Sequence, residues 1–198
     1  MITQNKFSSW LQNLVTESAD KKYRHRLFTE YLNTRDETLQ ALTAYVRNAH
    51  EDARRYLHEL FSNTLDPFGT QSSFDPAEGY PELLEMKTLK GYFGEIFAGL
   101  IAEYFSPFGE DDWKVPVFLF RYHTVAFQEL ERIRQTGGKA KEIPGRTGDD
   151  CLAFQVNSEG EIIRYLYCEA KCTSGGHLPE KVALAHKKVS ESAVVDLP

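Results

Sequence analysis

Two short apolar segments in the C-terminal part of the chain constrain its fold more than any other feature. Residues 151–156 and 162–172 are rich in β-branched, aromatic and cysteine side chains. The segment NSEGE at residues 157–161 has the polar and glycine content of a tight turn. We therefore expect an antiparallel hairpin, in which the residue before the first strand lies beside the residues that end the second strand.

This hairpin would bring together three charged residues that are far apart in the sequence. Asp150 directly precedes the first strand, and Glu169 and Lys171 lie near the end of the second. Because side chains alternate along a strand, Glu169 and Lys171 should share a face. Two carboxylates and the Ala170 carbonyl offer the hard oxygen ligands that Mg²⁺ or Mn²⁺ prefers. A lysine beside such an ion can orient a water molecule or neutralise charge on a phosphate.

A plainer interpretation of the same residues is also open. Glu169 and Lys171 could form an exposed ion pair on a strand, with Asp149 and Asp150 in a turn. A Glu-x-Lys triplet alone is common by chance. The combination of an aspartate before an apolar run, a hairpin-length gap and a terminal Glu-x-Lys is much rarer and favours a site.

The arrangement resembles the PD-(D/E)xK nuclease superfamily, which includes many restriction endonucleases. The shared pattern is a helix, a strand, an aspartate heading a strand, a strand with Glu-x-Lys and a further helix, over roughly residues 87–190. The resemblance implies that Asp150 and Glu169 bind the metal and that Lys171 is the catalytic lysine. Gly148 stands where the superfamily usually has a proline.

Many members of this superfamily carry a further acidic residue on their first core helix. Residues 89–105 have the apolar spacing of a strong helix. Glu95 lies on a stripe of small residues beside the apolar one: Gly91, Ala98, Gly99 and Ala102. Because small neighbours let a helix approach another element closely, we expect Glu95 to join the site as a catalytic residue and metal ligand.

Basic side chains near the expected site could grip a nucleic-acid backbone. Between residues 132 and 190 the chain has ten Lys and Arg against seven Asp and Glu, although its net charge is −6. The residues expected to contact nucleic acid are Lys139, Lys141, Arg146, Lys181, Lys187 and His177. For each one taken singly, a solvated helix face or loop is an equally good interpretation.

The sequence also predicts how the chain is organised. Apolar residues at helical spacing predict a helical N-terminal region at 1–65, with stripes over 7–15, 23–31 and 39–61. Residues 66–86 hold prolines and glycines with little periodicity and are expected to form a linker. Residues 87–198 are the expected nuclease core.

Within that core we expect a strand at 115–122, a helix at 126–135 and a last helix at 178–189. The expected fold class is α+β: a helical N-terminal region followed by a restriction-endonuclease-like mixed sheet flanked by helices.

The expected function is hydrolysis of phosphodiester bonds in DNA, with RNA as an alternative substrate and Mg²⁺ or Mn²⁺ as cofactor. The main alternative is a non-catalytic nucleic-acid-binding or assembly subunit with a nuclease-like fold. A third interpretation is a structural protein whose N-terminal helices dock a partner. The resemblance, rather than any residue, implies a helicase or ATPase partner and a role in defence against foreign DNA. An oligomer is also compatible with the sequence.

Composition excludes other classes of protein. No run approaches the length of about 18 apolar residues that a membrane helix needs. Three cysteines argue against a disulfide framework, and the N-terminus lacks a secretory signal pattern, so we expect a cytoplasmic protein. Without a C-x-x-C pair, Cys151, Cys168 and Cys172 are better explained as small apolar residues than as zinc ligands.

Overall fold

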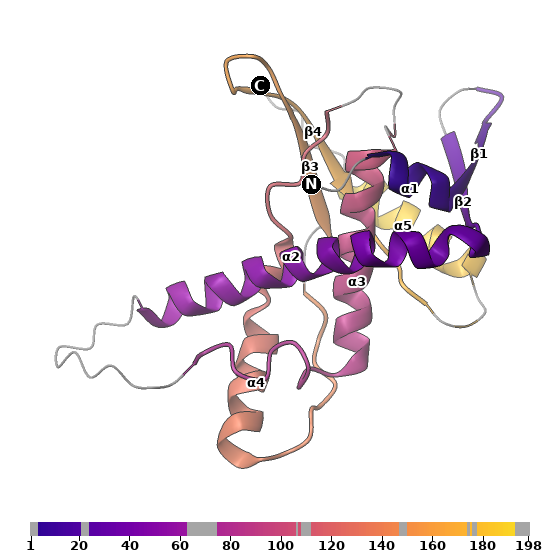
Figure 1. Ribbon diagram of the computed structural model, residues 1–198. Coiled ribbons are helices and arrows are strands. Elements are labelled where there is room, and N and C mark those ends of the chain that lie inside the picture. The colour runs from indigo at the N-terminus through magenta and orange to yellow at the C-terminus, as the bar shows by residue number, and fades with distance from the viewer. Residues whose placement is uncertain are drawn as a thin grey trace. The chain divides into compact units, whose positions relative to one another are not determined.

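The computed structural model describes residues 4–20, 24–62, 75–105, 107, 112–146, 150–173, 175 and 178–192. The chain divides into two compact units, Met1–Asn48 and Ala49–Pro198. The division falls within the sequence of the long helix α2 (Arg35–Ser62), which is labelled in Figure 1.

The first unit contains a short helix, a hairpin and the start of α2. The helix α1 (Gln4–Trp10) leads into β1 (Leu11–Glu17), which pairs antiparallel with β2 (Arg24–Glu30). A 3-10 turn, η1 (Leu32–Thr34), then precedes α2. The side chain of Phe7 is fully buried in this unit, and its ring meets the ring of Tyr45 edge-on at 6.4 Å between centroids.

The prediction of helices at 7–15 and 23–31 is therefore wrong beyond Trp10, where the chain forms strands. The helix predicted from the stripe at 39–61 is confirmed as part of α2. Pairing between the two segments decides the outcome. The Arg24 guanidinium bonds the Glu17 carboxylate across the strands at 2.8 Å, and the Tyr31 amide bonds the Trp10 carbonyl at 2.8 Å. Apolar spacing over so few residues does not distinguish a helix from a strand.

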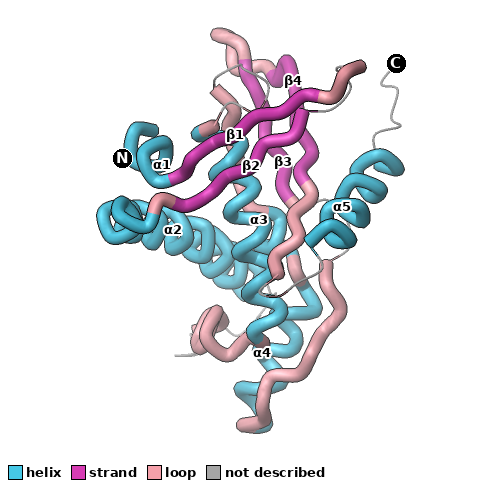
Figure 2. The backbone as a smooth tube through the Cα atoms, turned by 90° about the vertical axis from the view of Figure 1, so that its right-hand side faces the viewer, coloured by secondary structure: helices cyan, strands magenta, loops and turns pink. Residues whose placement is uncertain are grey.

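The second unit holds the C-terminal half of the fold. After the last turns of α2, its elements in chain order are α3 (Met86–Tyr104), η2 (Leu119–Tyr122), α4 (Thr124–Thr136), β3 (Cys151–Val156), β4 (Ile162–Cys168) and α5 (Leu178–Ser192). Figure 2 shows α3 beside the paired strands β3 and β4, and α3 packs against β3.

Small side chains on α3 allow that packing, as the sequence suggests. Ala102 is buried with Trp113 and with Ala153 of β3. A Cβ atom added to Gly99 would lie 2.7 Å from the Phe118 ring, so only glycine fits there without a shift of the ring. The buried side chains of β3 face this core, because the strand alternates buried and partly exposed residues from Cys151 onward.

The hairpin expected from strands at 151–156 and 162–172 is confirmed over residues 151–168. β3 and β4 are antiparallel with Cys151 opposite Cys168. The Asn157 side-chain oxygen accepts the Glu159 and Glu161 amides at 2.9 Å each, and Gly160 has a φ of 84°, which glycine adopts without strain. β4 ends at Cys168, however, so residues 169–172 follow the strand instead of extending it.

The strand expected at 115–122 is wrong. Only Lys114 forms a bridge, to Phe154, and Leu119–Tyr122 is a 3-10 turn. The Phe120 amide donates at 3.0 Å to the buried Glu95 carboxylate instead of to a neighbouring strand. The helices expected at 126–135 and 178–189 are confirmed as α4 and α5.

The α+β class holds, with one correction to its architecture. In the part of the chain that the structure describes, the strands form two separate two-stranded antiparallel hairpins and no single mixed sheet. Among the same residues, no helix is both long and apolar enough to cross a membrane.

Candidate functional site

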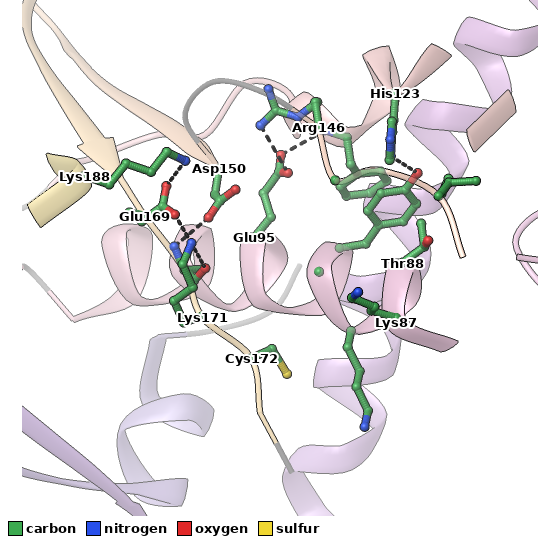
Figure 3. A pocket seen from close by; sticks show the side chains of 17 residues that line it. Lys87, Thr88, Glu95, His123, Arg146, Asp150, Glu169, Lys171, Cys172 and Lys188 are labelled. Atoms are coloured by element: carbon green, nitrogen blue, oxygen red, sulfur yellow. Dashed lines mark hydrogen bonds and ion pairs between the residues drawn. The ribbon is translucent and has the colours of Figure 1, made fainter. Parts of the chain in front are cut away.

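Asp150, Glu169 and Lys171 lie together at the open end of the β3–β4 hairpin (Figure 3). They line one pocket of about 330 Å³, to which Glu95 and Arg146 also contribute. The antiparallel register creates this grouping, because it sets the residue before β3 beside the residues after β4. The expectation that these three residues lie close together is therefore confirmed.

Hydrogen bonds across the end of the hairpin hold Asp150 in place. Its amide donates to the Cys168 carbonyl at 3.1 Å, and its Oδ2 accepts the Ala170 amide at 2.8 Å. Burial raises the pKa of Asp150, and the negative charge of Glu169 acts in the same direction. The Ala170 amide and the nearby lysines act against this rise.

The side chain of Glu169 is only 2% exposed. Its Oε1 is paired with the Lys171 ammonium and its Oε2 with the Lys188 ammonium from α5. Burial acts to raise the pKa of Glu169, but the hydrogen bonds from both lysines outweigh it, and the pKa is lowered. The ion pair of Glu169 and Lys171 therefore exists, but its carboxylate is not exposed.

Glu95 comes to the same pocket from α3. It is 3% exposed, its Oε1 accepts the Phe120 amide at 3.0 Å, and its Oε2 lies 3.7 Å from the Arg146 guanidinium. Burial raises the pKa of Glu95 to about 8, and the charge of Asp150 adds to the rise. In this arrangement both oxygens of Glu95 have protein partners.

Close packing against α3 positions the segment that carries Glu169 and Lys171. A Cβ atom added to Gly94 would lie 3.4 Å from the Cβ atoms of both Ala170 and Cys172. The small size of Gly94 therefore lets this segment lie directly on the helix, one residue before Glu95.

A buried histidine supports the loop that brings Arg146 to the pocket. The Nδ1 atom of His123 lies 3.0 Å from the Tyr92 hydroxyl oxygen, and its Nε2 atom lies 3.2 Å from the Pro144 carbonyl oxygen. Since a carbonyl only accepts, Nε2 carries the proton and Nδ1 accepts from Tyr92. Burial lowers the pKa of His123, which suits this neutral form.

The structure separates the expected nucleic-acid contacts into two groups. Arg146 lines the pocket, whereas Lys139, Lys141, Lys181 and Lys187 are exposed and do not line it. The Lys141 amide bonds Glu129 at 2.9 Å, and the Lys139 carbonyl accepts from Arg132 at 2.8 Å, so these two residues anchor their loop through the backbone. His177 lies outside the described residues, as does Asp149.

Three further lysines line the pocket beside Lys171: Lys87, Lys90 and Lys188, of which the last lies on the basic final helix. Helical phase could have favoured Lys188 over Lys187. With about 3.6 residues per turn, Lys188 lies close to the α5 stripe of Val182 and Ala185, whereas Lys187 points away from it. Lys87 and Lys90 gave no such signal, because their relevance depends on the distant residues that complete the pocket.

The donor chemistry of the pocket fits a divalent ion such as Mg²⁺ or Mn²⁺, because Asp150, Glu169 and Glu95 offer carboxylate oxygens. Burial also raises the pKa of Asp150 and of Glu95, and the charge of a neighbouring carboxylate adds to each rise. Among the described residues, however, no three His, Cys, Asp or Glu side chains are grouped closely enough to hold a metal. An ion would have to replace a lysine on Glu169.

Comparison with known proteins gives no further guide: the chain has no significant match to a protein-family model, a curated protein or a solved structure.

Proposed function

We propose that the chain is a nuclease that hydrolyses phosphodiester bonds in DNA and depends on Mg²⁺ or Mn²⁺. The observation that carries this proposal is the meeting of Asp150, Glu169 and Lys171 in one pocket whose remaining charged residues are mostly basic. The resemblance to PD-(D/E)xK nucleases gives each of the three a role.

The charge of the pocket supports an anionic substrate. Its lining includes five basic residues against three acidic ones, in a chain whose net charge is −6. The five basic residues are Lys87, Lys90, Arg146, Lys171 and Lys188. A local surplus of positive charge in an acidic protein concentrates phosphate groups at that place.

The residues of the pocket divide the work of hydrolysis. Asp150 and Glu169 would hold the divalent ion, and Glu95 joins them only if Arg146 releases it. When bound, such an ion supplies positive charge at the reacting phosphate and makes a nearby water more acidic. Lys171 orients the attacking water or neutralises the phosphate, and Arg146 binds a phosphate oxygen.

One observation favours the alternative, a nucleic-acid-binding or assembly subunit without catalysis. Both oxygens of Glu169 are paired with lysines, and no three-ligand group is present among the described residues. A pocket of that kind suits binding of a phosphate group without cleavage. The helicase or ATPase partner and the defence role remain expectations from the resemblance.

A plasmid-nicking assay with Mg²⁺ or Mn²⁺ tests the proposal. Wild type should convert supercoiled DNA to open circles, and Lys171→Met should lower the rate by about 10²–10³-fold, the usual loss when one charge-stabilising group is removed. Lys114→Met is the matched control, because Lys114 is exposed, lies outside the pocket and is not among the expected nucleic-acid contacts. Equal nicking by all three proteins would mean that a contaminating nuclease cuts the DNA. DNA binding with no nicking would reject the nuclease in favour of the binding subunit.

A further inference from the structure

We propose that Lys188 of α5 acts as an internal cation at the site: its ammonium occupies the Glu169 carboxylate when no divalent ion is bound, and the ion must displace it. This inference rests on the proposed function, since it describes how the same site admits its metal.

The contact itself comes from two elements that are distant in sequence. Lys188 reaches from α5 to Oε2 of Glu169, which directly follows β4, while Lys171 takes Oε1 (Figure 3). The Glu169 side chain is 2% exposed and that of Lys188 is 39% exposed. The charged end of Lys188 therefore enters an enclosed carboxylate site from the surface.

The positive charge of Lys188 stabilises the enclosed carboxylates. A buried carboxylate without a counterion is unfavourable, and here Asp150 lies beside Glu169 and adds negative charge. Positive charge from Lys188 also opposes the burial effect on Asp150. A divalent ion held by Glu169 would supply positive charge at the same place, so the ion and the Lys188 ammonium would compete for the carboxylate.

Lys188 is the lysine that can leave. Lys171 is separated from Glu169 by only one residue, so it cannot move far from that carboxylate. Lys188 stands on α5, whose Val182 and Leu184 are 55% and 56% exposed. Withdrawal of α5 from Glu169 would therefore uncover little additional apolar surface at these positions.

Direct measurement of Mn²⁺ binding to the metal-free full chain tests this competition. Isothermal titration calorimetry should show Mn²⁺ binding to Lys188→Met about tenfold more tightly than to wild type, a factor typical of coupling between two binding events. Lys187→Met should bind as wild type does. Lys188→Gln, which keeps a polar side chain, is the second variant, and circular dichroism checks that each variant is folded.

The outcomes separate this inference from the proposed function. Equal or weaker Mn²⁺ binding by Lys188→Met and Lys188→Gln, or no binding by any protein, overturns the inference. If wild type binds Mn²⁺ and Asp150→Asn abolishes that binding, the metal site of the proposed function is retained without the competition by Lys188. If Asp150→Asn leaves binding unchanged in every background, the metal lies elsewhere and both ideas fail.

Discussion

The two hairpins among the described residues are alike in length and pairing, and differ in how they bury their acidic residues. In β1–β2, Glu17 pairs with Arg24 across the strands, and their side chains are 44% and 40% exposed. At the open end of β3–β4, Glu169 pairs with two lysines and its side chain is 2% exposed. Water reaches both partners of the first pair, whereas in the second the carboxylate is enclosed and only its two lysines are partly exposed.

Burial also distinguishes carboxylates of the two units by their pKa, apart from Glu169, whose two lysines lower its pKa. In the first unit, hydrogen bonds from Arg35 and Trp10 lower the pKa of Glu30 to about 2. In the second unit, burial raises the pKa of Glu95 to about 8 and also raises that of Asp150. In a surface salt bridge the two partners and water balance the charges, whereas a group of enclosed carboxylates favours binding of an additional cation. This difference is why we assign the site to the second hairpin.

The largest expected effect is on DNA cleavage. Glu169→Gln should reduce the nicking rate by about 10³-fold, because it removes a charged ligand while keeping the size of the side chain. Glu17→Gln changes the same residue type in the exposed pair and should leave the rate unchanged. Initial rates on supercoiled plasmid at saturating Mn²⁺ measure both. Comparable losses in the two variants would show that burial is not what distinguishes the hairpins.

A smaller effect is expected on the pH dependence of stability. Because burial raises the pKa of Glu95 from 4.5 to about 8, the folded chain holds this proton more tightly. The resulting stability is complete below about pH 4.5 and is lost as the pH rises through about 8. Wild type should therefore lose on the order of 3 kcal/mol relative to Glu95→Gln between pH 5 and pH 8.

Urea denaturation in the presence of a chelator at several pH values measures this difference. The control is Glu30→Gln: the pKa of Glu30 is lowered to about 2, so its stabilising effect is present above pH 4.5 and is lost only as the pH falls toward 2. The Glu30 variant should keep the wild-type slope between pH 5 and pH 8. A Glu95 variant with that same slope would contradict the assignment of a raised pKa.

The smallest effect is expected for the exposed pair. A double-mutant cycle with Glu17→Gln and Arg24→Gln should give a coupling energy of about 0.5 kcal/mol or less, because water and side-chain entropy offset the attraction. The coupling should shrink further in high salt. Chemical denaturation of the four proteins gives the value. A coupling above about 1 kcal/mol would mean that the first hairpin depends on its ion pair as strongly as a buried one.

Local sequence predicted the second hairpin far better than the first. The Asn157–Glu161 turn and the apolar strands on either side specify one register, and that register alone brings Asp150 beside Glu169. The first hairpin has the apolar spacing of short helices, and its strands are stabilised by partners across the pair, such as Arg24 for Glu17. Periodicity within a segment contains no information about such partners.

By itself, the sequence determined the α+β class, the β3–β4 hairpin and the grouping of Asp150, Glu169 and Lys171, because each follows from residues that are close along the chain or joined by one turn. Only the tertiary structure decided that the strands form two separate hairpins, that Glu95 binds the Phe120 amide, and that Lys188 instead of Lys187 reaches Glu169. These features depend on which distant groups share a buried space. Burial sets the strength of a charge–charge contact, and it exists only once the chain has folded.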